Sequence, residues 1–262
     1  MKELIDGLNL PKQILDKTEK LLNTLFGEGF KEIGGIFGDR MRIKRLENQI
    51  KILDKANQIM EKNGLKPNQI NLKVLVPLIE KSSLEEDEKL QEKWANLISN
   101  ISSFPENGLE PKLVKTLSNL SSIEASILDY LHSKFSFKRN SVFEQSKNSF
   151  RKYNTIEEVE LNRIQLYFKD VKEQFKLTEE FTNMYIDNLE SLGLIRNDFP
   201  EIEIDNGFSE AEIVENRFDE KKEEIELNLD LTANYSRSED FYFTSYGLYF
   251  INQCKDIETN VT

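Results

Sequence analysis

Residues 82–101 read SSLEEDEKLQEKWANLISNI, and this stretch has the clearest helical pattern in the chain. Its apolar side chains recur every three or four residues, which places them on one helical face. Ser82 and Ser83 each precede a glutamate by three residues, as in a capping box. We therefore predict a helix that begins at these serines. The structural motif consists of one residue of the predicted cap segment and three core residues: Leu84, Leu90, Trp94 and Leu97.

Four consecutive acidic residues, 85–88, stand at the predicted start of this helix. The helix dipole favours negative charge there, whereas a Mg²⁺ site usually takes ligands from several elements. We therefore interpret the run as a helix start and predict no metal site. Glu85, Asp87 and Gln91 are expected on the exposed face, where they are candidates for contact with a partner.

Helical patterns also precede this stretch. A first helix is expected after Pro11, and residues 30–63 read as one long helix that ends at Gly64. Residues 71–81 are an apolar run with Pro77 inside it. That run could be a short strand by composition, but its helical flanks favour a kinked helix.

After the opening stretch, residues 111–119 predict a short helix, and Ser121 with Glu124 forms a capping box before a helix over 123–135. Residues 138–154 lack periodicity and are predicted to be a loop. Two further helices are expected over 155–176 and 178–192.

The period then changes from helical to alternating. Strands are predicted over 194–196, 224–231 and 241–244, followed by a closing helix over 245–254. The acidic segment 197–223 between the first two strands is interpreted as a loop inserted in a wing. Three helices followed by a β-hairpin are the order of a winged helix.

The predicted fold class is therefore mainly α. We expect an N-terminal helical bundle over residues 1–109, followed by a winged-helix-like α+β module over 110–262. The segment Leu189-Glu-Ser-Leu-Gly-Leu-Ile195 resembles the end of a winged-helix recognition helix.

Charge is unevenly distributed along the chain. The net charge is −12, and residues 178–262 hold 21 acidic and 6 basic residues, a net of −15. The predicted helix 178–192 has no Lys or Arg. DNA-binding helices need cationic and amide donors, so this composition argues against nucleic-acid binding by the C-terminal module.

Catalytic and metal chemistry have few residues available. His132 is the single histidine and Cys254 the single cysteine, and no motif places a partner beside either. One His and one Cys cannot supply an ordinary structural zinc site. We therefore predict a protein without catalytic residues, cofactor or metal. No signal peptide or apolar span is recognisable, and the cytoplasm is the expected location.

A glycine-rich segment lies near the N-terminus, beside a basic cluster. It lacks the Gly-Lys-Ser/Thr of a phosphate loop. The cluster consists of Arg40, Arg42, Lys44 and Arg45, which are candidates for partner contact. Segment 26–45 could rest on an anionic membrane surface, although a packed helix with a solvated basic end is favoured. The glycines would also allow close helix–helix approach in a homo-oligomer.

Residues 72–100, LKVLVPLIEKSSLEEDEKLQEKWANLISN, resemble the core motif of the Abi-alpha family of bacterial proteins. The basic stretch 38–50 and the segments 189–195 and 244–254 also resemble that family's pattern. The resemblance implies a role in abortive infection, a defence against phage, and it brings no catalytic residues with it.

Two hypotheses follow. The first is a non-catalytic interaction protein in anti-phage defence that senses or sequesters a protein partner, such as a phage component, and that we expect to be a homo-oligomer. The alternative is an effector that acts at a membrane surface through segment 26–45.

Overall fold

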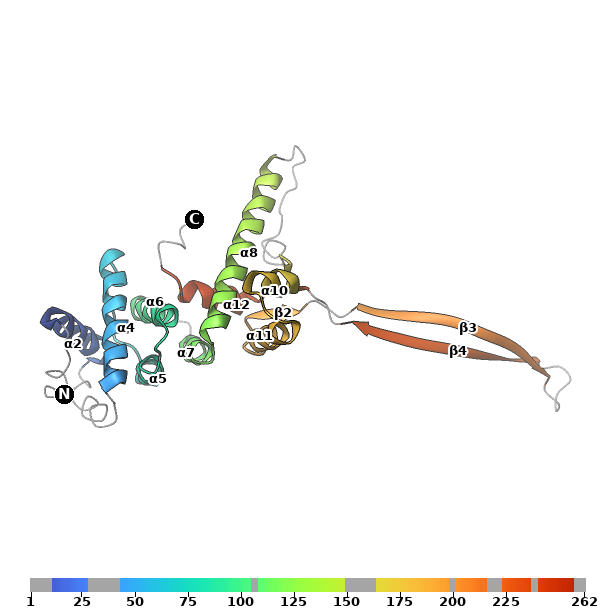
Figure 1. Ribbon diagram of the computed structural model, residues 1–262, viewed down its shortest axis with the longest axis horizontal. Coiled ribbons are helices and arrows are strands. Elements are labelled where there is room, and N and C mark those ends of the chain that lie inside the picture. Colours follow the sequence, from blue (N-terminus) through green and yellow to red (C-terminus); the bar gives the residue numbers. More distant parts are fainter. Residues whose placement is uncertain are drawn as a thin grey trace.

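The computed structural model describes residues 11–27, 43–104, 108–148, 164–197, 201–215, 223–236 and 240–256. These residues form a mainly helical body, a small three-stranded sheet and a separate two-stranded ladder (Figure 1). The helices are α2 (Lys12–Phe26), α4 (Ile43–Lys62), α5 (Leu72–Ser82), α6 (Glu88–Ser103), α7 (Glu110–Ser118), α8 (Ser122–Asn148), α10 (Phe168–Phe175), α11 (Glu179–Ser191) and α12 (Ser245–Gln253). The strands are β1 (Leu166–Tyr167), β2 (Ile195–Asn197), β3 (Glu201–Glu215), β4 (Glu223–Ser236) and β5 (Asp240–Phe243).

Helix α6 lies at the centre of the helical body, between α4 on one side and α8 and α12 on the other. The apolar stripe that the sequence predicts is buried along its length, and Trp94 is one of the largest fully buried side chains. Leu90 and Leu97 are buried with it. The opening stretch therefore packs as its periodicity indicates.

The start of α6 differs from the prediction. Its N-cap is Asp87, whose Oδ1 accepts hydrogen bonds from the backbone N–H groups of Lys89 at 3.0 Å and Leu90 at 3.1 Å. Ser82 and Ser83 instead end α5, because their hydroxyls donate to carbonyl oxygens of that helix. The predicted capping boxes at these two serines are therefore wrong. The turn they begin leaves Leu84 56% exposed to solvent.

The preceding segments are helical, as predicted. Pro77 lies inside α5, so the strand alternative for that run is excluded. Gly64 follows α4 with φ of +63°, a conformation that suits glycine at a helix end. Residues 30–42, the first part of the predicted long helix, lie outside the described residues.

Helix α8 begins with the predicted capping box but extends into the segment predicted to be a loop. Ser121 N–H donates to Glu124 Oε2 at 2.8 Å, and Glu124 N–H donates to Ser121 Oγ at 3.3 Å. The helix then continues to Asn148, so the predicted loop is wrong over 138–148. Residues 139–142 are all exposed. A helix that is solvated on all sides has no apolar stripe, which explains the missing periodicity.

The predicted helix over 155–176 is also corrected. Residues 155–163 lie outside the described residues, and Leu166–Tyr167 form β1 before the short helix α10. Leu166 is buried opposite Phe241, its partner in β5. This pairing depends on a strand far along the chain, so the local helical pattern does not reveal it.

The small sheet has the order β1-β5-β2, with both neighbouring pairs antiparallel. Helix α11 and Gly193, with φ of +73°, lead directly into β2. Between β2 and β5 the chain leaves the sheet and returns. The predicted strand at 241–244 and the predicted helix after it are confirmed as β5 and α12.

The excursion between β2 and β5 is a long antiparallel ladder. β3 pairs with β4 from Glu201 opposite Ser236 to Glu215 opposite Glu223, with one register shift at Phe208 and Glu210. Figure 1 shows the ladder projecting from the helical body as an arm. The predicted loop over 197–223 is therefore wrong for residues 201–215. The alternation of Glu and Ile in 201–204 suits a strand, but only pairing with β4 reveals it.

The buried apolar side chains form one hydrophobic cluster. It includes residues of the N-terminal helices, such as Leu53 and Trp94, together with Phe243 and Phe250 near the C-terminus. Helix α12 contacts both α6 and α8, so the end of the chain packs against its first half. The division at residues 109 and 110 stays a prediction.

Candidate functional site

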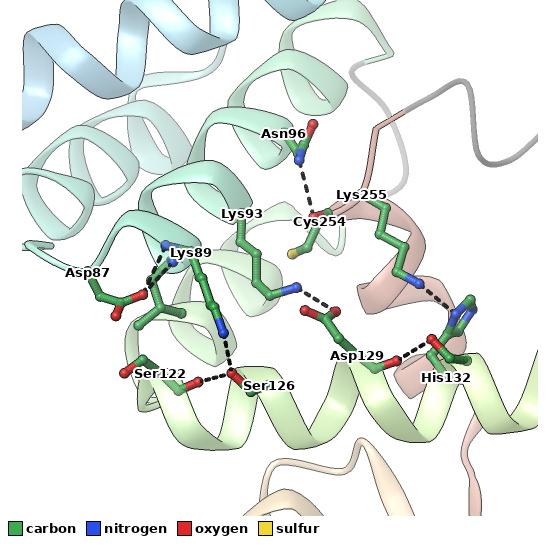
Figure 2. Close-up of polar contacts among 12 residues, drawn as sticks. Asp87, Lys89, Lys93, Asn96, Ser122, Ser126, Asp129, His132, Cys254 and Lys255 are labelled. Atoms are coloured by element: carbon green, nitrogen blue, oxygen red, sulfur yellow. Dashed lines mark hydrogen bonds and ion pairs between the residues drawn. The ribbon is translucent and has the colours of Figure 1, made fainter.

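The junction of α6, α8 and α12 gathers polar and ionisable side chains from distant parts of the chain (Figure 2). Helix α12 is positioned at its N-terminus by Thr244, whose Oγ1 accepts from Gly247 N–H at 2.9 Å and donates to the carbonyl of Gly193. Gly247 lies so close to the backbone of Leu194 that a Cβ would overlap the Leu194 carbonyl oxygen. This anchor aims the C-terminal end of α12 at α6 and α8.

Two polar pairs join the three helices at this junction. Lys93 of α6 forms an ion pair with Asp129 of α8, with 2.7 Å between Nζ and Oδ1. Lys255, just after α12, places Nζ 2.6 Å from Nδ1 of His132 on α8. Figure 2 shows both pairs lying along the same side of α8. The side chain of Lys93 is only 12% exposed, so its charge depends on Asp129.

Burial first and the ammonium group of Lys255 second lower the pKa of His132 from 6.5 to about 4. Asp129 opposes this shift, and Lys93 adds to it. The imidazole is therefore neutral at neutral pH. Neutral Nδ1 accepts the hydrogen bond from Lys255, which leaves the ring proton on Nε2. Burial also lowers the pKa of Lys255. The arrangement is a donor–acceptor contact and not a poised general base.

Cys254 lies beside these residues but is not an activated nucleophile. It is buried, and burial raises the pKa of its thiol to about 12. A reactive cysteine needs a lowered pKa and solvent access, so this thiol stays protonated and inert. The local chemistry is that of a packed core residue.

The backbone at the end of α12 is also held by side chains. Asn100 Nδ2 donates to the carbonyl of Gln253 at 2.9 Å, and Asn96 Nδ2 donates to that of Cys254 at 3.4 Å. Asp256 accepts from the Nζ of Lys62 and from the Nδ2 of Asn63, each at 3.2 Å. Residues 253–256 are thus tied to α4, α6 and α8, and we call this segment the C-terminal clamp.

Three residues predicted on the exposed face of α6 hold its first turn together. The Gln91 side chain is only 4% exposed and donates to the Glu85 carbonyl at 2.9 Å. Oε1 of Glu85 accepts from the backbone N–H groups of Glu86 and Asp87, each at 3.0 Å. The expected exposure of Gln91 is therefore wrong, because its amide completes the turn.

The predicted basic cluster is described only in part. Arg40 and Arg42 lie outside the described residues, and Lys44 is exposed. Arg45 donates to Ser83 Oγ from Nε at 3.1 Å and from Nη2 at 3.0 Å, so it ties α4 to the turn before α6. Arg45 and Glu85 therefore lie near the same turn, which the sequence does not indicate.

Metal binding and membrane spanning gain no support from the described residues. In the part of the chain that the structure describes, no group of three His, Cys, Asp or Glu side chains is placed to hold a metal ion. Likewise, none of the described helices has the length and apolar character needed to cross a bilayer.

Sequence reasoning missed most of the junction. Lys93, Asp129 and Lys255 are separated by 36 and 126 positions along the chain, and no local motif connects them. It also missed the surface of α11, where Phe181 and Met184 are 51% and 58% exposed. A helical wheel of 179–191 would have placed Met184 opposite the buried face and Phe181 at the edge of the exposed side.

Comparison with known proteins gives one match. The family model of abortive infection alpha, Abi_alpha, matches residues 42–254, which span α4 to α12 and include Lys93, Asp129 and His132 of the junction. No curated protein and no solved structure matches the chain. The matched range covers most of the sequence, so this chain belongs to the Abi_alpha (abortive infection alpha) family.

Proposed function

We propose that this chain acts in abortive-infection defence against phage as an interaction protein that recognises a protein partner and performs no catalysis. The family match over residues 42–254 carries the anti-phage role. The state of the two most reactive side-chain types supports a role without catalysis. His132 is neutral and already accepts a hydrogen bond, and Cys254 is a buried, protonated thiol.

We further propose that the second half of the chain is a winged-helix-like module. The order α8, β1, α10, α11, β2, β5 and the sheet order β1-β5-β2 support this assignment. In that arrangement α11 holds the position of the recognition helix. The β3–β4 arm replaces the usual short wing (Figure 1).

The charge of α11 favours protein as the ligand of this module. The helix contains four acidic residues and no Lys or Arg, so it would repel a phosphate backbone. Its exposed side includes an aromatic ring and a thioether, Phe181 and Met184. Aromatic residues and Met are enriched at protein–protein interfaces.

The membrane-surface alternative gains no support. Most of segment 26–45 lies outside the described residues, and Arg45 is engaged with Ser83. We therefore retain the interaction protein as the proposed function.

The experiment is a phage challenge of cells that express the chain, beside cells with an empty vector. We expect cells that express the chain to show fewer plaques with at least one phage. At high multiplicity of infection, the infected cells should die without releasing progeny phage. The tagged chain should then enrich a specific protein from infected cells. Equal plaque counts with every phage in a broad panel would contradict the defensive role.

A further inference from the structure

Helix α11 has two faces of different character. Thr182, Ile186 and Leu189 are buried and hold the helix on the body. Phe181 and Met184 are both exposed and three residues apart, so they are neighbours on the helix surface. Met184 lies opposite the buried side chains, and Phe181 lies at the edge of the exposed side. Roughly half of each side chain is open to solvent, which makes them an adjacent apolar pair rather than scattered residues.

Exposed acidic side chains lie on the same helix as this apolar pair. Glu179, Glu180 and Asp187 are all exposed on α11. Lys172 of α10 pairs with Glu179 at 3.3 Å. Helix α11 itself has four acidic residues and no Lys or Arg. We call Glu180, Phe181, Met184 and Asp187 the α11 face.

We propose that the α11 face docks a basic segment of another protein that carries large apolar side chains, such as one face of a cationic amphipathic helix. This inference rests on the proposed function and names the class of partner. Phe181 would supply contact area, and the flexible Met184 would adapt to the apolar side chains of the partner. The carboxylates would attract the basic residues and orient them.

The same charges disfavour the other occupants. Nucleic acid and anionic lipid would bring phosphates against Glu179, Glu180 and Asp187. The α11 face of a second copy would bring the same carboxylates against this one, because residues 178–262 hold the excess of acidic residues. Charge complementarity therefore favours a basic protein segment.

The first test uses the purified full chain and a labelled probe peptide of about 14 residues with Lys on one helical face and Leu on the other. A twin peptide with Glu in place of each Lys is the control. Fluorescence anisotropy should show binding of the Lys peptide alone. The double variant Phe181→Ser/Met184→Ser should weaken binding by about tenfold or more. Glu180→Lys should weaken it as well and reduce its dependence on salt.

A matched variant controls for general loss of apolar surface. Phe104, at the end of α6, is 63% exposed, and Phe104→Ser should leave the affinity of the Lys peptide within about twofold. Equal weakening by this variant and by the α11 double variant would overturn the proposal. Equal binding of the two peptides would also overturn it, as would binding of a labelled DNA duplex that the α11 double variant loses. Circular dichroism of each variant establishes that it is folded.

The second test separates this inference from the proposed function. Cells that express wild type, Phe181→Ser/Met184→Ser or Phe104→Ser are challenged with a phage that the wild type restricts. Loss of protection in the α11 variant alone supports docking through α11. Protection by all three overturns the α11 proposal and leaves the defensive role standing, whereas no protection by the wild type contradicts the defensive role itself.

Discussion

The ammonium of Lys255 lies 2.6 Å from Nδ1 of His132, and the two residues join the end of α12 to α8. In this contact the imidazole is the acceptor, so it must stay neutral for the contact to persist. The single histidine of the chain therefore acts in the C-terminal clamp as a hydrogen-bond acceptor. Its protonation would place a positive charge beside Lys255 and Lys93.

Acidification should destabilise the folded chain through His132. The unfolded chain binds a proton with an ordinary pKa of 6.5, whereas the folded chain binds it only near pH 4. The contribution of His132 to stability is thus fully present above pH 6.5 and is lost as the pH falls toward about 4. Urea unfolding measures the free energy of unfolding at about pH 7 and at about pH 4.5. Between these pH values this free energy should fall less for His132→Gln than for wild type. Gln has an amide oxygen that can accept from Lys255 and does not titrate. Identical losses in the two proteins would contradict this prediction.

Removal of the Lys255 charge should raise the pKa of His132. Burial is the first cause of the low value and Lys255 the second, so Lys255→Met should move the pKa upward from about 4 but not fully to 6.5. Because the chain has one histidine, its imidazole proton signal in an NMR titration is unambiguous. Lys62→Met removes a cation of α4 that pairs with Asp256 of the clamp, and this control should leave the pKa of His132 unchanged. An unchanged midpoint in Lys255→Met would show that the charge does not act on the ring.

The helices were predictable where local patterns suffice. The apolar stripe with Trp94 and the Ser121–Glu124 capping box both appear in the structure as the sequence indicates. The serines at 82 and 83 show the limit of such patterns. Both precede glutamates correctly, yet Asp87 lies closer to the true helix start and caps it. The sequence alone does not show which of Ser82, Ser83 and Asp87 caps the helix, because the choice depends on where α5 ends and how it packs.

One strand of the ladder was predictable, because residues 224–231 alternate and lie within β4. Strand β3 and the clamp were not predictable: β3 is revealed by its pairing with β4, and acidic composition masked the alternation in residues 201–204. In the clamp, Lys255 reaches His132 across 123 positions of sequence. Such contacts result from the packing of α12 on α6 and α8, which no local periodicity encodes.

Loss of the Lys93–Asp129 pair should cost more stability than loss of an exposed pair. Asp129→Asn leaves the largely buried ammonium of Lys93 without its carboxylate, and we expect a loss of about 2 kcal/mol in the free energy of unfolding. The control is Glu61→Gln, which breaks the exposed Lys17–Glu61 pair at 2.9 Å and should cost less than about 0.5 kcal/mol. Urea unfolding at neutral pH measures both. Equal losses in the free energy of unfolding for the two variants would mean that the charge of Lys93 does not need the carboxylate of Asp129.

The anchor of α12 should tolerate no side chain at Gly247. A Cβ at this position would overlap the carbonyl oxygen of Leu194, and both backbones are fixed by Thr244. Relief would require α12 to move away from β2, which would loosen the clamp at its other end. We therefore expect Gly247→Ala to lower the free energy of unfolding by about 3 kcal/mol or more.

The matched control for Gly247 is Gly64→Ala. Gly64 has φ of +63°, but no atom lies within 4 Å of the position that a Cβ would occupy, so alanine there meets conformational strain without a clash. That strain should cost about 1 kcal/mol. Urea unfolding of both variants separates the two effects, because only the Gly247 variant should also raise the accessibility of Cys254 to alkylating reagents. Equal losses and an equally protected thiol in the two variants would show that α12 can shift without disturbing the clamp.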